Sequence, residues 1–121
     1  MPWNPDKKGN LKGVRGDSGQ VIFRKGTQAD KNAPFVPTDL TGVTVKAQVR
    51  SKPNGYVVFE FVPDYSQAAD GYIILNVDAD VTELIKVTEA VWDVQLTWPS
   101  GTVQTLFGGT RDVEIVKDTT L

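Results

Sequence analysis

The strict alternation of apolar and polar residues over 43–50 constrains the fold more than any other feature of this chain. Four apolar residues occupy every second position (Val43, Val45, Ala47 and Val49), and four polar residues lie between them (Thr44, Lys46, Gln48 and Arg50). Successive side chains of a β-strand point to opposite faces, so this segment predicts a strand with one buried face and one solvated face. A strand in a parallel sheet, buried on both faces, would show a continuous apolar run instead.

The same period of two recurs along the chain. We expect further strands near residues 21–24, 57–61, 72–77, 91–98, 103–107 and 113–115. In the segment 91–98, Trp92 falls on the buried face and Asp93 on the solvated face. Phe59 and Phe61 share a face with Val57, and Pro63-Asp64 is expected to end that strand. The pattern predicts an all-β fold, an antiparallel immunoglobulin-like β-sandwich of about seven strands.

One interruption of this pattern predicts a helix. Val81, Leu84 and Ile85 lie at helical spacing, which would place them on one buried face. Asp80 is suited to the N-cap, and Glu83 follows three residues later as in a capping box. We therefore expect one short helical turn near residues 80–86.

Turn residues separate the predicted strands. Asp39-Leu40-Thr41-Gly42 predicts a structural corner, with Leu40 in the core and Gly42 at positive φ. Pro53-Asn54-Gly55 predicts a hairpin turn, because Asn and Gly tolerate positive φ. We interpret Arg15-Gly16-Asp17 as a turn before a strand, with Arg15 and Asp17 able to pair, rather than as an adhesion ligand.

The amino-terminal residues have a different composition. Residues 1–19 contain two prolines and four glycines and few apolar side chains, so we predict an N-terminal arm over 1–19 and the sandwich domain over 20–118. Two interpretations of the arm remain open: a flexible end, or a segment that becomes ordered against a neighbour with Trp3 as its anchor.

Composition excludes several classes of function. The 121 residues suffice for one domain, and the chain has neither histidine nor cysteine. A Ser-His-Asp triad and thiolate chemistry are therefore absent, and we predict that the chain is not an enzyme, with no catalytic residues, cofactor or small-molecule substrate. The net charge of −2 gives no basic surface for nucleic acid, and no apolar run is long enough for a membrane span. We predict no metal site, because Asp78 and Asp80 supply only two positions of a calcium loop.

A series of short motifs follows in order between residues 15 and 117. They are Arg15-Gly16-Asp17, Asp39-Leu40-Thr41-Gly42, Lys46-Ala47-Gln48-Val49-Arg50, Gly71-Tyr72-Ile73-Ile74-Leu75, Thr82-x-Leu84, Trp92-Asp93-Val94-Gln95-Leu96, and Gly101-Thr102-Val103-Gln104-Thr105-Leu106 before Gly108-Gly109 and Val113. In their order and spacing the chain resembles the small immunoglobulin-like structural proteins of tailed bacteriophages. It is also similar to the N-terminal domain of phage baseplate upper proteins.

The resemblance implies a structural or adaptor component of the virion, in the tail, baseplate or neck, made in the host cytoplasm. Its expected partners are other virion proteins, including copies of itself, and it implies no catalytic residues. The chain departs from the baseplate proteins because no fibre or receptor-binding domain follows, which favours an adaptor or decoration role. Two alternatives remain open: a carbohydrate- or receptor-binding module of the adsorption apparatus, and a head decoration protein.

Four residues are the candidates for partner contacts. They are Trp3, Leu11, Tyr65 and Trp98, chosen because aromatic and large apolar side chains dominate binding surfaces. For Trp98, at a strand end beside Pro99, the edge of the core and an interface are equally compatible with the sequence.

Overall fold

The structure, a computed structural model, describes the backbone of residues 10–116 and the side chains of this range except 107–112 and 116. A five-stranded sheet has the order β1-β10-β9-β5-β6 and a three-stranded sheet the order β2-β8-β7. The strands of the first sheet are β1 (Leu11–Val14), β10 (Val103–Val116), β9 (Glu89–Thr97), β5 (Thr44–Arg50) and β6 (Val57–Glu60). Those of the second are β2 (Gly19–Arg24), β8 (Tyr72–Val77) and β7 (Val62–Asp64).

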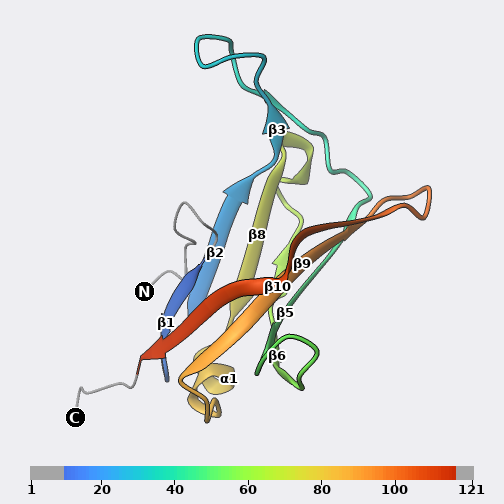
Figure 1. Ribbon diagram of the computed structural model, residues 1–121. Coiled ribbons are helices and arrows are strands. Elements are labelled where there is room, and N and C mark those ends of the chain that lie inside the picture. Colours follow the sequence, from blue (N-terminus) through green and yellow to red (C-terminus); the bar gives the residue numbers. More distant parts are fainter. Residues whose placement is uncertain (1–9, 117–121) are drawn as a thin grey trace.

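The smaller elements lie at the ends of these two sheets. A separate two-stranded sheet is formed by β3 (Gly26–Thr27) and β4 (Val36–Pro37). The 3₁₀ turn (Ala68–Asp70) precedes β8, and the helix α1 (Ala79–Glu83) follows β8. Figure 1 shows the β3–β4 hairpin at one end of the sandwich and α1 at the other.

The strand order is that of an immunoglobulin-like β-sandwich, which confirms the predicted fold class. The run β10-β9-β5-β6 corresponds to the G-F-C-C′ sheet of a variable-type domain, and β2-β8-β7 corresponds to B-E-D. One detail differs from the prediction: β1 runs parallel to β10, with Leu11 opposite Val113, so the larger sheet is mixed rather than purely antiparallel.

The core lies between the two sheets and is centred on Trp92, as the alternation predicted. Trp92, Val94 and Leu96 of β9 are completely buried, and Val21 and Leu75 enter the same cluster from the other sheet. The Trp92 ring meets Phe61 edge-on, with 6.3 Å between ring centroids. This geometry is favourable for aromatic quadrupoles and adds to the burial of the rings.

The chain crosses from one sheet to the other at Phe61, which the sequence did not reveal. The expected single strand over 57–61 is in fact β6 in the large sheet, with β7 following in the small one. Phe61 lies between them with its side chain buried, and its N–H donates to the carbonyl of Ala47 at 2.9 Å. Pro63 does not end a strand but lies inside β7, where an edge position tolerates its missing N–H. Val57 is exposed rather than inward, because a register shift between Val49 and Arg50 places Val57 opposite Arg50.

The predicted boundary between arm and domain at residues 19 and 20 is wrong over residues 11–14. These residues form β1, and Leu11 is buried in the core. Hydrogen bonding to β10, about 100 positions later in the sequence, supplies the order that local composition does not. Residues 1–9, with Trp3, and residues 117–121, with the predicted domain end at 118, lie outside the described residues.

The helix forms where predicted but with a different orientation. It begins after Asp78, which occupies the N-cap without a side-chain hydrogen bond, so the predicted capping box around Asp80 and Glu83 is wrong. Thr82 and Ile85 are buried, whereas Val81 and Leu84 are exposed.

Both predicted corners have the expected conformation. Gly42 has a φ of 81°, and Asn54 is the non-glycine residue with positive φ among the described residues, at 63°. Asp39 accepts hydrogen bonds from the N–H and the hydroxyl of Thr41, at 2.9 and 2.6 Å. These bonds lower the pKa of the Asp39 carboxyl, the hydroxyl bond having the larger effect. A corresponding turn at Asp64, where the N–H of Ser66 donates, lowers the pKa of that carboxyl in the same way.

Candidate functional site

The most distinctive feature outside the core is the hairpin of residues 26–37, which extends away from the sandwich (Figure 1). Its two short strands pair Gly26 with Pro37 and Thr27 with Val36. Every residue from 27 to 36 is exposed except Ala33, which is half-buried. The hairpin therefore contributes almost nothing to the core and presents its side chains to solvent.

Side-chain hydrogen bonds organise the tip of this hairpin. The side-chain amide of Gln28 donates to the carbonyl of Ala33 at 2.6 Å. The carboxylate of Asp30 accepts from the N–H of Asn32 at 2.8 Å, and the carbonyl of Asp30 accepts from the N–H of Ala33 at 3.1 Å. Local bonds of this kind replace a helix or sheet ladder and fix a turn. The tip is consequently preorganised although it is solvent-exposed.

A cation–π cluster anchors the base of the hairpin. The Arg24 guanidinium, at the end of β2, lies over the ring of Tyr72, with 4.7 Å to the ring centroid, and over the ring of Phe35, with 5.2 Å. Its Nε donates to the carbonyl of Asp70 at 2.8 Å. One arginine thus connects β2, β8 and the returning arm of the hairpin. At an exposed site each such ring contact contributes about 0.5–1 kcal/mol.

Close backbone packing also restrains the base. The N–H of Lys25 donates to the carbonyl of Gly71 at 2.8 Å, and the carbonyl of Lys25 accepts from Thr38 at 2.9 Å. Gly71 has a φ of 82°, and a Cβ there would approach the carbonyl oxygen of Lys25 to 2.4 Å. A Cβ on Gly26 would meet the Phe35 ring at the same distance of 2.4 Å. Only glycine fits at either position, so the direction of the hairpin is fixed by its base.

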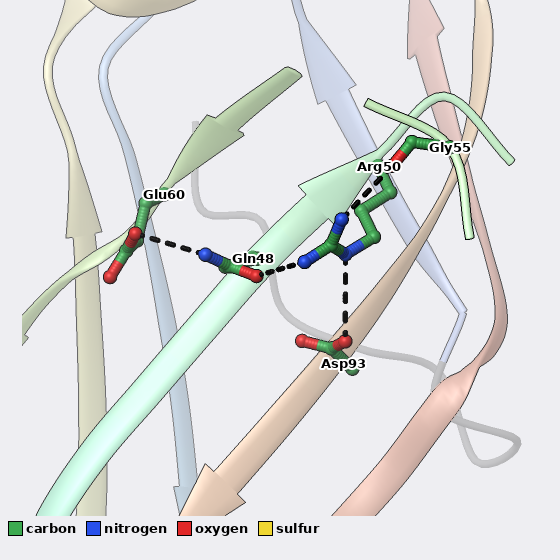
Figure 2. A network of polar contacts seen from close by, with 5 residues as sticks. All are labelled: Gln48, Arg50, Gly55, Glu60 and Asp93. Carbon is green, nitrogen blue, oxygen red and sulfur yellow. Dashed lines mark hydrogen bonds and ion pairs between the residues drawn. The ribbon is translucent and has the colours of Figure 1, made fainter. Parts of the chain in front are cut away.

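A second polar cluster lies on the outer face of the large sheet (Figure 2). Gln48 donates to Glu60 at 3.2 Å and accepts from Arg50 at 2.8 Å, while Arg50 also donates to the carbonyl of Gly55 at 2.9 Å. The Arg50 Nε lies 4.0 Å from a carboxylate oxygen of Asp93. The carboxylates of Glu60 and Asp93 are thus connected through the neutral Gln48 and the cationic Arg50. The cluster links β6, β5 and β9 and holds the β5–β6 turn, which is a structural role.

The structure does not bring the predicted contact residues together on one surface. Leu11 is in the core and Trp98 is half-buried against it, so neither is presented to a partner as an exposed anchor. Tyr65 is exposed, but its hydroxyl accepts a hydrogen bond from the N–H of Val45 at 2.9 Å, which ties the side chain to β5. Trp3 lies outside the described residues.

The hairpin was missed by our reading of the sequence, although a signal is present. Asp30, Asn32 and Pro34 are turn formers within the ten positions between β3 and the end of β4. The contact between Arg24 and Phe35 has no local signature, because the two residues are brought together by the hairpin itself.

Two further properties of the described residues concern metals and membranes. Among the side chains that the structure describes, no group of three or more acidic residues is placed to hold a metal ion. Across the same part of the chain, every helix is too short to cross a bilayer.

No family model and no curated protein matches the chain. A solved structure of murine CRIg is similar, with 12% sequence identity over 91% of this chain and 92% of that one and a TM-score of 0.38. The immunoglobulin-like assignment above follows from the strand order of the chain itself.

Proposed function

We propose that this chain is a non-enzymatic structural or adaptor component of a tailed phage virion, in the tail, baseplate or neck, which docks on other virion proteins through the 26–37 hairpin. The motif order that resembles phage structural proteins supports the virion context. The preorganised, exposed hairpin is the observation that carries the docking role.

The physical argument for docking is entropic. A flexible loop must lose conformational freedom when it binds, and this loss is subtracted from the affinity. Here the tip is fixed by Gln28 and Asp30, and the base is fixed by Arg24 and Gly71. Such a loop on a rigid sandwich is the usual place for recognition residues.

The hairpin can be removed without removing core residues, which gives the proposal a direct test. Residues 29–34 would be replaced by Asn-Gly, a two-residue turn suited to a hairpin. Because these side chains lie outside the core, we expect the melting temperature to change by less than about 2 °C, in line with ordinary surface substitutions. In a phage deleted for the gene, the shortened protein should complement poorly and be depleted from purified particles.

A matched control uses another exposed turn. Ser100→Ala changes an exposed polar residue in the turn between β9 and β10, outside the hairpin, and it should assemble normally. Normal incorporation of the hairpin-shortened protein would remove the hairpin from the docking role.

The carbohydrate- or receptor-binding alternative has one specific observation in its favour. Tyr56 and Tyr65 expose 63% and 45% of their surface, and exposed aromatic rings are suited to stacking on sugars. Glycan binding by the isolated protein, abolished by Tyr56→Ala, would favour this alternative over an adaptor.

A further inference from the structure

The helix α1 reverses the usual distribution of polar and apolar residues. Thr82 is completely buried, whereas Leu84 exposes 77% of its surface and Val81 exposes 38%. Leu84 is the C-cap residue that follows α1, and residues three positions apart are neighbours on a helix surface, so we treat Val81 and Leu84 as one apolar patch. The helix α1 lies at the end of the sandwich opposite the hairpin (Figure 1).

Hydrogen bonds of Thr82 explain why the helix has this orientation. Its hydroxyl accepts from the N–H of Gly16 at 3.1 Å and donates to the carbonyl of Asp17 at 2.7 Å. The turn between β1 and β2 therefore holds Thr82 inward. With Thr82 inside, Leu84 lies on the opposite side of the helical turn and faces the solvent, whereas Val81 lies at the edge of the buried face and is partly exposed. Their exposure follows from specific contacts rather than from fraying of a short helix.

The segment that carries the patch is rich in exposed carboxylates, and the half-buried Arg15 also lies beside it, with its guanidinium donating to the carbonyl of Val87 at 3.5 Å. Asp78, Asp80, Glu83 and Glu89 are all exposed in the segment 78–89, against one exposed basic residue, Lys86. An apolar centre with a charged rim is the usual anatomy of a protein-binding surface, and the sign of the rim selects the partner.

We propose that Val81 and Leu84 form a second docking surface, whose occupant is a segment of another protein that carries an apolar side chain flanked by lysine or arginine. The apolar side chain covers Leu84, and the basic residues face the four carboxylates. A membrane surface is disfavoured, because anionic lipid headgroups would be repelled by the same carboxylates. The proposal stands on the segment 78–89 alone and holds whether or not the hairpin docks on a virion protein.

The test uses two defined peptides and the complete ¹⁵N-labelled chain. The first probe is a blocked hexapeptide of alternating lysine and leucine, and the second has glutamate in place of lysine. Amide spectra recorded during titration should shift at residues 78–89 with the basic peptide only. Binding should weaken as salt is added, because the charges are exposed and screened.

Variants separate the patch from the rest of the surface. Leu84→Ser should weaken binding of the basic peptide about tenfold, the loss typical of an interface anchor. Val103→Ser is the control, because Val103 of β10 exposes 57% of its surface on a different element. It should leave the affinity unchanged. Melting curves of both variants establish that they are folded.

Any of three results in the peptide titrations would overturn the proposal: shifts that avoid residues 78–89, equal binding of the acidic peptide, or equal losses in Leu84→Ser and Val103→Ser. Co-sedimentation of the wild-type chain with phosphatidylserine vesicles, lost in Leu84→Ser, would overturn it in favour of a lipid surface. If the chain is not found in phage particles but still binds the basic peptide, the virion proposal is rejected and the docking surface at Val81 and Leu84 is retained.

Discussion

Replacing Trp92 by alanine tests the register on which the fold depends. Trp92 has no exposed surface and meets Phe61 edge-on at 6.3 Å. A buried tryptophan removes about 150–250 Å² from water, which at about 25 cal/mol/Å² corresponds to roughly 4–6 kcal/mol. Part of the cavity collapses in practice, and measured tryptophan truncations cost about 3–5 kcal/mol. For a domain of this length a loss of 1 kcal/mol lowers the melting temperature by about 4 °C, so we expect a decrease of roughly 12–20 °C.

The neighbouring residue provides the control for this prediction. Asp93 lies on the outer face, with 23% of its side chain exposed and the Arg50 Nε 4.0 Å away. Asp93→Asn removes a partly solvated ion pair, which is worth less than about 1 kcal/mol. Both variants would be unfolded by heat and by urea, followed by circular dichroism. Equal losses from the two substitutions would refute the assignment of inner and outer faces in β9.

Three further predictions concern the turns and the amino terminus. Thr82→Val should cost about 1–3 kcal/mol in urea unfolding, because Gly16 and Asp17 lose their buried partner, whereas the exposed Thr88→Val should cost little. Hydrogen bonds from Thr41 lower the pKa of the Asp39 carboxyl in the folded state. The ionised Asp39 carboxylate therefore stabilises the fold above the ordinary pKa of 3.8, and this stabilisation is lost as the pH falls through the folded pKa. The difference in unfolding free energy between wild type and Asp39→Asn should accordingly shrink below pH 3.8. Deletion of residues 1–12 should lower the melting temperature because it removes Leu11 from the core, and equal melting of this deletion and the full chain would contradict the assignment of β1.

The parts of the fold that were predictable are those set by local pattern. The alternation over 43–50 and 91–98 is imposed by the two faces of a strand, and it located the core at Trp92 and Val94. The corners at Gly42 and Asn54 depend on positive φ, which few residues tolerate, so sequence alone identified them.

The errors came from contacts between distant segments. β1 has a glycine in its centre and only four residues, and it exists because it pairs with β10. The orientation of α1 is set by the Thr82 hydroxyl, which bonds a turn 65 positions away. Of the face predicted from Val81, Leu84 and Ile85, only Ile85 is buried. The spacing of apolar residues indicates which face of a segment tends to be buried. A hydrogen bond from a buried side chain to a distant segment can override this tendency.

The candidate site was the least predictable part. Trp98 was predicted to contact a partner because it is aromatic, but it packs on the core. Phe35 was not predicted, and its ring contacts Arg24 at the base of the hairpin. Interface aromatics and core-edge aromatics have the same sequence signature, and only their tertiary partners distinguish them.

Cross-linking of purified particles tests the docking account most directly. Lys31 is exposed at the tip of the hairpin, so an amine-reactive cross-linker can reach it, and Lys46 on the outer face of β5 is an exposed reference. The account predicts that particles contain this chain and that Lys31 is cross-linked to another virion protein more often than Lys46 is. Particles that lack the chain, or in which Lys31 forms no cross-link to a neighbour, would contradict it.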